Sequence, residues 1–370
     1  MLAFDVETTT LDKGSPFNKN NKLVAIGLGE ALFYKEFDVP AIQKLVDENK
    51  LIGFNIKFDI HWLRNIGISF RNASIYDCQL AEFLLTNQTT PYPSLNEVAE
   101  KYLGEKKLDI IKEEYWDKGV DTWFIPQCLL LEYLKKDLEL TLRVFQIQEQ
   151  LLKEQGKWSL FLLQCADLLV LEDMEFNGIL YQQEKSVLLG EQLGEQIERT
   201  RKNILSYTEL PNFNCNSGDH LSCLLYGGTL IHQFRVPIGT YKSGAKIGQI
   251  RYKLFEQKYE QPRLVEPLKG SALKKEGYWS TDEPTLRSLK CSKETKKLVD
   301  NILELAKLET LQSKYFFGIP KLMEKRGWVD FLHGNLNQCV ARTGRLSASE
   351  PNQQNMAPEV KTLCTSRYND

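Results

Sequence analysis

The opening residues of the chain alternate apolar and acidic side chains, which is the pattern of a β-strand with one polar face. Asp5 and Glu7 are two positions apart in the run 2–7, so both carboxylates should leave the same face of that strand. Further apolar runs predict three more strands, at 23–28, 31–34 and 51–54. Helical spacing follows at 56–65, 79–85, 95–103 and 127–150. This order of elements predicts an α/β domain over residues 1–150.

The second half of the chain has a different pattern. Helical spacing recurs over long stretches, at 158–176, 184–207 and 292–326. Residues 212–280 are rich in Gly, Lys and Tyr, which favours loops with short elements, and 327–370 shows no clear periodicity. A chain of 370 residues is too long for one ordinary hydrophobic core. We therefore expect a mainly helical part over 151–330 and a third part over 331–370.

The overall composition is that of a globular protein, with 42% hydrophobic and 26% charged residues. This balance excludes a disordered tail, a collagen-like repeat and a membrane bundle. The sequence has no apolar run of about 18 residues and no signal-peptide pattern at its start, so we expect a cytoplasmic protein without a membrane partner. The eight cysteines form no C-x-x-C pair, which favours reduced thiols over disulfides or a zinc site.

Charge is unevenly distributed along the chain, although the formal net charge is only −2. Residues 1–240 hold 34 Asp and Glu against 24 Lys and Arg, whereas residues 241–370 hold 15 against 23. An acidic front half could concentrate metal ions, and a basic rear half could bind a polyanion.

Three short segments of the front half carry carboxylates in a suggestive order. Asp5 and Glu7 on the first strand would repel each other unless a cation lay between them. Asp59 follows a predicted strand-to-helix junction, and Asp137 lies one helical turn after Tyr133 on a predicted helix. Clustered carboxylate oxygens are ligands that suit Mg²⁺ or Mn²⁺.

These segments resemble the three motifs of the DEDD-type 3′–5′ exonucleases of the RNase H-like superfamily. FDVETTTL resembles the first motif, NIKFDIHWL the second, and YLKKD the third in its tyrosine variant. The resemblance covers roughly residues 1–145. It implies an RNase H-like domain, a mixed sheet with flanking helices, that removes nucleotides from 3′ ends.

The resemblance also implies a role for each of these residues. Asp5, Glu7 and Asp137 would hold the metal ion that binds the attacking water. Asp5 and Asp59 would serve a second ion, the latter through water. The cofactor would be two Mg²⁺ ions, which Mn²⁺ could replace. Tyr133 would orient the nucleophile by hydrogen bonding, because a phenol of ordinary pKa near 10 is a poor base.

Other positions of these motifs are candidates for contacts with DNA. Thr8 and Leu11 follow the first motif where the family contacts the terminal nucleotide, and Asn55 begins the second. Ordinary packing or turn chemistry explains each of the three about equally well. Asp77 matches an acidic residue that the family often has before a helix, and we interpret it as a helix N-cap.

The rear half resembles the family A DNA polymerases, in a phage-like style. The run 168–181 is similar to the segment that leads into their thumb, and 212–228 and 277–289 are similar to thumb elements. The run 332–357 resembles the stretch T-x-T-G-R-L-S-S…P-N-L-Q-N, which leads into the palm. The resemblance implies a thumb over 151–330 and the start of a palm over 331–370.

The palm-like run offers polar side chains to a primer–template. Arg342 and Arg345 suit bidentate phosphate contacts, and Asn352, Gln354 and Asn355 could bond sugars or base edges. The segment 239–258 is cationic and contains aromatic residues, so it could follow a duplex backbone, although a solvated loop explains it equally well.

The sequence stops before the palm strand that bears the family's first catalytic aspartate. We therefore expect nucleotide addition to need a separate palm–fingers polypeptide, the chain being one part of a split polymerase or a truncated product. The expected ligands are a DNA primer–template and single-stranded 3′ ends.

Two other functions stay open at this stage. One is a stand-alone DEDD exonuclease acting on DNA or RNA, with the rear half as a substrate clamp. The other is a DNA-binding subunit whose exonuclease is silent. The presence of all four acids and Tyr133 argues against the second.

Overall fold

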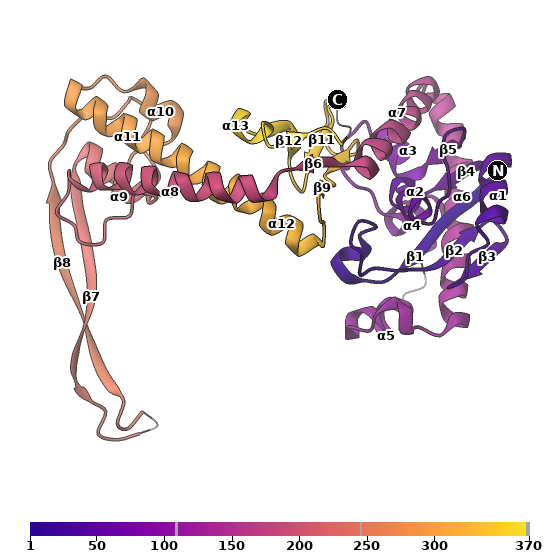
Figure 1. Cartoon of the computed structure of the whole chain (residues 1–370), viewed down its shortest axis with the longest axis horizontal. Helices are drawn as coiled ribbons and strands as arrows, with labels where there is room; N and C mark the ends of the chain where they lie inside the picture. Colours follow the sequence, from indigo (N-terminus) through magenta and orange to yellow (C-terminus); the bar gives the residue numbers. More distant parts are fainter. Residues whose placement is uncertain (108–109, 245, 368–370) are drawn as a thin grey trace. The chain divides into compact units, whose positions relative to one another are not determined.

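The computed structural model describes residues 1–107, 110–244 and 246–367; positions 108–109, 245 and 368–370 lie outside the described residues. The chain divides into two compact units, which are treated separately below (Figure 1). The first unit comprises residues 1–183 and 319–370, and the second comprises residues 184–318. The boundaries near 150 and 330 stay a prediction. Within the described ranges, no helix is both long and apolar enough to cross a membrane.

A five-stranded mixed sheet forms the centre of the first unit (Figure 1). Its strands, in spatial order, are β3 (Ala31–Tyr34), β2 (Leu23–Leu28), β1 (Leu2–Thr8), β4 (Lys50–Gly53) and β5 (Ser74–Asp77). The strands β1, β2 and β3 pair antiparallel, whereas β1, β4 and β5 pair parallel. The mixed sheet predicted from the sequence is confirmed, and β5 is an addition to it.

Helices flank this sheet, and four of them match the helical spacing predicted at 56–65, 79–85, 95–103 and 127–150. They are α1 (Val39–Glu48), α2 (Ile56–Asn65), α3 (Cys78–Leu85), α4 (Leu95–Leu103), the short α5 (Ile110–Glu114), α6 (Gln127–Glu154) and α7 (Trp158–Asn177). Buried Leu134 and Leu138 of α6 pack against residues of β1 and β2. A Cβ at Gly27 would lie 2.5 Å from Leu138 Cδ1, so the glycine permits the close approach of α6 to the sheet.

The last residues of the chain pack into the first unit in short strands. A three-stranded sheet joins β12 (Cys364–Thr365), β6 (Ile179–Tyr181) and β9 (Phe331–Leu332). The strands β10 (Asn335–Asn337) and β11 (Ser347–Ser349) pair with each other. The helices α12 (Gly318–Arg326) and α13 (Pro358–Lys361) complete this region. Strands of two or three residues are too short to show periodicity, which is why the sequence did not predict them.

The second unit combines helices with one long β-hairpin. Its helices are α8 (Gln183–Leu205), α9 (Gly218–Tyr226), α10 (Glu283–Ser288) and α11 (Lys293–Thr310), the last continuing into a π-helical turn, Leu311–Phe316. Their core includes the buried side chains of Ile204, Leu225 and Leu298.

The prediction of loops with short elements over 212–280 was wrong for the hairpin. The strands β7 (Gly228–Thr240) and β8 (Ile250–Gln261) pair over almost their whole length. Both faces of this hairpin are largely exposed. The run 250–254 does alternate apolar and basic residues, but the Gly- and Lys-rich stretch before it favoured loops.

Candidate active site

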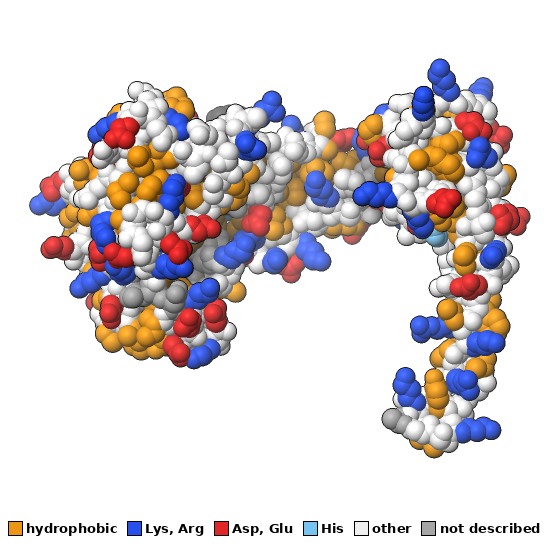
Figure 2. Space-filling model, turned by 180° about the vertical axis from the view of Figure 1, so that it is seen from behind, with side chains coloured by type: hydrophobic (Ala, Val, Ile, Leu, Met, Phe, Trp, Pro, Cys, Tyr) orange, Lys and Arg blue, Asp and Glu red, His pale blue; other side chains and the backbone are white. Residues whose placement is uncertain are grey.

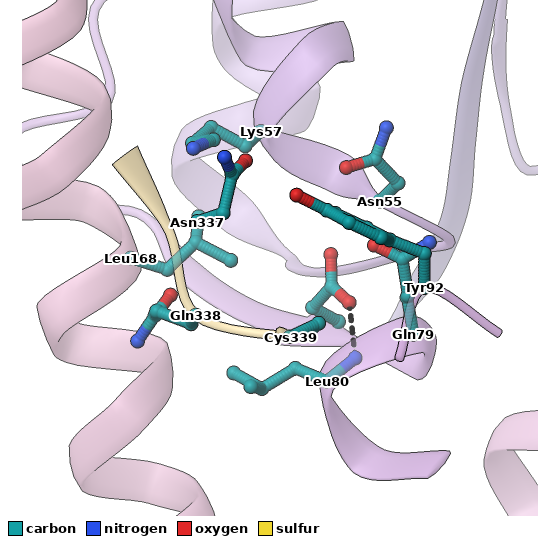
Figure 3. Close-up of a pocket in the computed structure, with 10 residues that line it drawn as sticks. Asn55, Lys57, Gln79, Leu80, Tyr92, Leu168, Asn337, Gln338 and Cys339 are labelled. Carbon is teal, nitrogen blue, oxygen red and sulfur yellow. Dashed lines mark hydrogen bonds between the residues drawn. The ribbon is translucent and has the colours of Figure 1, made fainter. Parts of the chain in front are cut away.

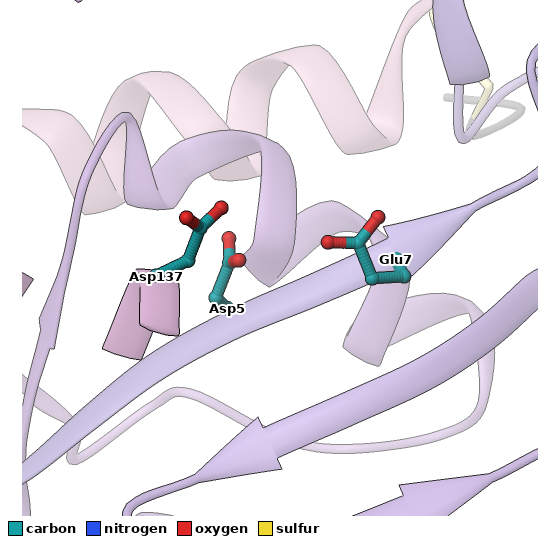
Figure 4. Close-up of side chains that lie close together, drawn as sticks. All are labelled: Asp5, Glu7 and Asp137. Atoms are coloured by element: carbon teal, nitrogen blue, oxygen red, sulfur yellow. The ribbon is translucent and has the colours of Figure 1, made fainter. Parts of the chain in front are cut away.

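Three carboxylates from two elements converge in the first unit (Figure 4). Asp5 and Glu7 project from the same face of β1, opposite Gly27 and Ala25 of β2. Asp137 projects from α6, on the buried side of the helix. One ligand oxygen from each of the three lies within 4.8 Å of the others. The structure therefore brings together three of the four acids that the sequence singled out.

The fourth acid, Asp59, is attached to the same strand by a backbone hydrogen bond. Its Oδ1 accepts from Val6 N at 3.1 Å, between the two acids of β1, and its side chain is buried. Asp59 lies in the first turn of α2, which begins at Asn55 in the left-handed region with φ of 60°. The start of α2 thus fixes Asp59 beside the cluster.

Asp77 holds the start of α2 in place. One of its carboxylate oxygens accepts from Ile56 N at 2.7 Å, and the other accepts from Leu80 N at 2.7 Å at the start of α3. The predicted role of Asp77 as a helix N-cap is confirmed, and the structure adds the second helix. Burial raises the pKa of Asp77 to about 6, against the lowering effect of these backbone donors.

The acidic cluster is electrostatically strained in the absence of a cation. Burial, followed by repulsion from Asp137, raises the pKa of Asp5 to about 7. Burial and then the charge of Asp5 raise the pKa values of Glu7 and Asp59 well above their ordinary values. Among the described residues, the buried Asp137 Oδ1 has no hydrogen-bond partner. A site of buried carboxylates with an oxygen left over suits a hard divalent cation.

Lys107 is a site residue that sequence analysis missed. Its ammonium forms an ion pair with Asp137 Oδ2 and donates to the phenol oxygen of Tyr133 at 3.0 Å. Its backbone N–H donates to Asn96 Oδ1 at 2.9 Å, so α4 holds the segment that carries the lysine. Burial raises the pKa of Asp137 although the Lys107 charge acts to lower it. No motif marks this lysine, because it reaches the cluster from the connection after α4.

Tyr133 lies one turn before Asp137 and is buried with it on α6. Its ring packs edge-on against Trp116, with ring centroids 5.6 Å apart. Burial, and then the charge of Asp137, raise the pKa of its phenol. The phenol is therefore neutral near pH 7 and can donate its proton in a hydrogen bond.

A second buried network, also missed from the sequence, fixes α2 against α7. His61 Nδ1 lies 2.9 Å from Glu172 Oε1, and His61 Nε2 lies 2.9 Å from Glu175 Oε2. Lys57 Nζ lies 2.7 Å from Glu175 Oε1 and also donates to Leu336 O. The two glutamates are three residues apart on one face of α7, and that spacing was the available signal. The network orients the helix that carries Asp59.

Two of the three candidates for nucleotide contact, Leu11 and Asn55, are exposed. Leu11 is 51% exposed and opens the turn Leu11–Gly14, and Asn55 is exposed at the start of α2. Thr8 ends β1 and is half-buried, with its hydroxyl donating to Thr9 O at 3.2 Å.

Asn55 also lines a small polar cavity of the first unit (Figure 3). Figure 3 shows the ring of Tyr92 beside the Asn55 side chain, and Lys57 and Asn337 on the other side of the opening. The other lining residues are Asp77, Gln79, Leu80, Leu168, Gln338 and Cys339. The cavity therefore joins the start of α2 to the segment that contains β10.

The candidate DNA-binding residues of the palm-like run 332–357 are exposed, and they are far in sequence from the acids of the cluster. Arg342 and Arg345 follow β10, and Asn352 and Gln354 follow β11. Asn352 Oδ1 accepts from Asn355 N at 3.3 Å and so caps a short 3₁₀ turn. Their predicted contacts with DNA stay a prediction.

Two family models match the chain. The family described as 3'-5' exonuclease matches residues 1–153, and the family described as DNA polymerase family A matches residues 242–367. Together with the mixed sheet and flanking helices, the first match confirms the predicted RNase H-like fold class of the front half.

Curated relatives that are DNA polymerases match more than half of the chain. DNA polymerase I of Pseudomonas aeruginosa is 24% identical over 379 residues, which cover 96% of this chain and 36% of that protein. DNA polymerase DpoZ of Salmonella phage PMBT28 is 28% identical over 222 residues, which cover 55% of this chain and 35% of that protein. The chain thus spans about a third of the length of the curated relatives it matches.

The fold is also similar to a solved structure, the POL domain of Pol1 from M. smegmatis in complex with DNA primer-template and dNTP. The TM-score is 0.66 over 96% of this chain and 52% of that one, at 17% sequence identity. At this identity, the likeness concerns the fold alone.

Proposed function

We propose that the first unit hydrolyses the 3′-terminal phosphodiester bond of a DNA strand, because residues 1–153 match the 3'-5' exonuclease family and residues 242–367 match DNA polymerase family A. One observation carries this proposal: oxygens of Asp5, Glu7 and Asp137 lie within 4.8 Å of one another. Both elements that carry them belong to the matched exonuclease residues.

The residues of the cluster fit a divalent metal. All donors are carboxylate oxygens, their raised pKa values reflect burial and mutual repulsion, and Asp137 Oδ1 has no partner among the described residues. Domains of this family depend on metal, and the ions proposed here are two Mg²⁺, which Mn²⁺ could replace. When bound, they lower the pKa of water and stabilise the negative charge that develops on the departing 3′ oxygen.

The protein's own groups would then bind and orient. Asp5, Glu7 and Asp137 accept the cations, and Asp59 is held beside them by the Val6 amide. Lys107 donates to the Tyr133 phenol oxygen, which leaves the phenol proton to hydrogen-bond the attacking oxygen. We assign Tyr133 this orienting role, and Thr8, Leu11 and Asn55 the contacts to the terminal nucleotide.

Removing single carboxylates tests the proposal. In Mg²⁺, the wild-type chain should shorten a 5′-labelled single strand of DNA from its 3′ end. Asp5→Ala and Asp137→Ala should each lower this rate about a thousandfold, which corresponds to about 4 kcal/mol of transition-state stabilisation. Glu30→Ala removes an exposed carboxylate of the β2–β3 turn and should retain the wild-type rate.

Undiminished hydrolysis by Asp5→Ala and Asp137→Ala would overturn the assignment. A wild-type chain that binds Mg²⁺ but leaves DNA and RNA intact would instead support a silent exonuclease. Faster hydrolysis of RNA than of DNA would favour the stand-alone exonuclease on RNA.

The match to DNA polymerase family A supports a second, wider proposal. In it, the second unit acts as a thumb and the run 331–367 begins a palm, with Arg342, Arg345, Asn352 and Gln354 facing the primer–template. The phage-like style and the separate palm–fingers polypeptide stay predictions. Primer extension on mixing the chain with a palm–fingers polypeptide would support the latter, and its absence would count against it.

A further inference from the structure

The hairpin of the second unit extends far beyond the core that anchors it. At its base, Leu230 of β7 is buried, and Tyr259 of β8 packs against the same core. From Gln233 to Thr240 and from Ile250 to Lys258, every residue is exposed. Figure 1 shows the two strands running outward from α9 as a twisted ribbon. A two-stranded hairpin is at best marginally stable in water, so a ligand that covers the outer half would stabilise it.

The strand register assigns the side chains of this ribbon to two faces. On one face, Phe234 opposes Phe255 and Val236 opposes Lys253. The two phenylalanine rings stack with centroids 6.0 Å apart, and Lys253 Nζ lies 5.3 Å from the Phe255 centroid. This face therefore combines a stacked apolar surface with a cation.

The other face repeats that combination with different residues. Arg235 opposes Leu254, and Pro237 opposes Tyr252. All four side chains are exposed. Both faces of the ribbon thus present an ammonium or guanidinium group next to apolar side chains.

Charge along the ribbon is segregated. From Arg235 to Lys253 the sequence has five basic residues and no acidic one. The five are Arg235, Lys242, Lys246, Arg251 and Lys253, and all are exposed. The acids lie nearer the base, where Glu256 accepts from Gln233 and Glu260 from Thr229. Figure 2 shows Lys and Arg side chains interleaved with hydrophobic ones along this outer part.

These features favour a polyanionic ligand over a protein. Lysine is depleted at the centres of protein–protein interfaces, whereas the outer ribbon carries three lysines and two arginines without a counter-charge. A groove of duplex DNA admits a two-stranded ribbon, and phosphates line both of its walls. A ribbon with cations on both faces can contact the phosphates on both walls of a groove. A flat ligand would contact the cations of one face only.

We propose that the outer half of the β7–β8 ribbon, Arg235–Lys253, binds duplex DNA by lying in a groove, with its cations on the phosphates of both strands. Its apolar side chains contact sugars, and no base sequence is read. The inference rests on the proposed function in taking DNA as the ligand. It uses binding instead of hydrolysis as its readout, so the two can fail separately.

The test compares two sets of charge removals in the full chain. The ribbon variant carries Lys242→Gln, Lys246→Gln, Arg251→Gln and Lys253→Gln. The control carries Lys290→Gln, Lys293→Gln, Lys296→Gln and Lys297→Gln, four exposed lysines before and on α11 of the same unit. Binding of a labelled blunt duplex is followed by fluorescence anisotropy against salt, with a chelator present to prevent hydrolysis.

The ribbon variant should bind at least about tenfold more weakly at low salt than the wild type. Because each lost phosphate contact removes about 0.9 from the slope of log affinity against log salt, the loss of four contacts should reduce the magnitude of the slope by about 3.6. The control should keep most of the wild-type slope. Glu30→Ala, which removes an exposed carboxylate of the first unit, should bind the duplex as the wild type does.

Three results would overturn the inference. In the first, the ribbon variant keeps the wild-type affinity and slope. In the second, the control loses as much slope as the ribbon variant. In the third, the chain self-associates in sedimentation, and Tyr252→Ser with Phe255→Ser abolishes the association but leaves duplex binding unchanged, which would assign the ribbon to a second copy. Equal circular dichroism spectra of the variants establish that all are folded.

Discussion

The carboxylate cluster of the first unit and the ribbon of the second use charge in opposite ways. Asp5, Glu7 and Asp137 are held by a packed sheet and helix, and burial, followed by repulsion from Asp137, raises the pKa of Asp5 to about 7. The five cations of Arg235–Lys253 are exposed on the ribbon. A site that binds a small ion needs ligands on rigid, buried elements. A surface that binds a long polyanion needs exposed cations spread over an extended element.

Stability should show this contrast most strongly. Phe4 is fully buried in the core beneath the cluster, and Phe255 is 39% exposed on the ribbon. Phe4→Ala should lower the free energy of unfolding by about 3–5 kcal/mol, because it leaves a cavity. Phe255→Ser should change it by less than about 0.5 kcal/mol. Urea unfolding gives the free energy of unfolding of both variants. A similar loss of free energy in Phe4→Ala and Phe255→Ser would contradict the contrast between the buried cluster and the exposed ribbon.

The pH dependence of stability should reveal the strain at the cluster. Because the pKa of Asp5 is raised in the folded chain, its contribution to stability is fully present below its unfolded pKa and is lost as pH rises through about 7. Without metal, Asp5→Asn should therefore be more stable than the wild type at pH 8, by about 4 kcal/mol for a pKa raised by about three, and by less than half as much at pH 5. Urea unfolding with a chelator at both pH values checks this; an equal effect at both would contradict it.

Asp77 should stabilise the start of α2, the helix that carries Asp59. Asp77→Ala removes the acceptor of two buried amides, at the starts of α2 and α3. We expect a loss of about 1–2 kcal/mol of unfolding free energy, and Asp77→Asn should recover part of it by accepting one bond. Thermal unfolding of the two variants provides the measurement. Asp38→Ala, which removes an exposed cap of α1, is the matched control and should cost less.

The smallest effect concerns Lys107. Its ammonium forms an ion pair with Asp137, one of the carboxylates proposed to hold the metal, so Lys107→Met should strengthen Mn²⁺ binding several-fold at pH 8.5. Lys107→Arg keeps the charge and should bind Mn²⁺ as the wild type does. Calorimetry of the metal alone gives the affinities. Weaker binding by Lys107→Met would show that the lysine supports the metal site instead of competing with it.

Sequence patterns predicted the parts of the site that lie on regular elements. Alternation placed Asp5 and Glu7 on one face of a strand, and helical spacing placed Tyr133 and Asp137 together. Lys107, in contrast, lies in the connection after α4, thirty positions before Asp137. The spacing of residues within one strand or helix cannot predict a contact between two separate segments.

Other features were missed for related reasons. The close approaches of His61 to Glu172 and Glu175 depend on the packing of α2 against α7, which no single segment encodes. The ribbon was missed although 250–254 alternates apolar and basic residues, because the Gly- and Lys-rich stretch before that run favoured loops.

The most direct test of the account is a titration of Mn²⁺ into the metal-free full chain at pH 8, followed by electron paramagnetic resonance of the free ion. We predict saturable binding by the wild type that Asp137→Asn weakens about a hundredfold, because the substitution removes a charged ligand of the cluster. Glu30→Ala should bind as the wild type does. Equal binding by Asp137→Asn and the wild type would contradict the claim that the buried carboxylates of β1 and α6 form a metal site.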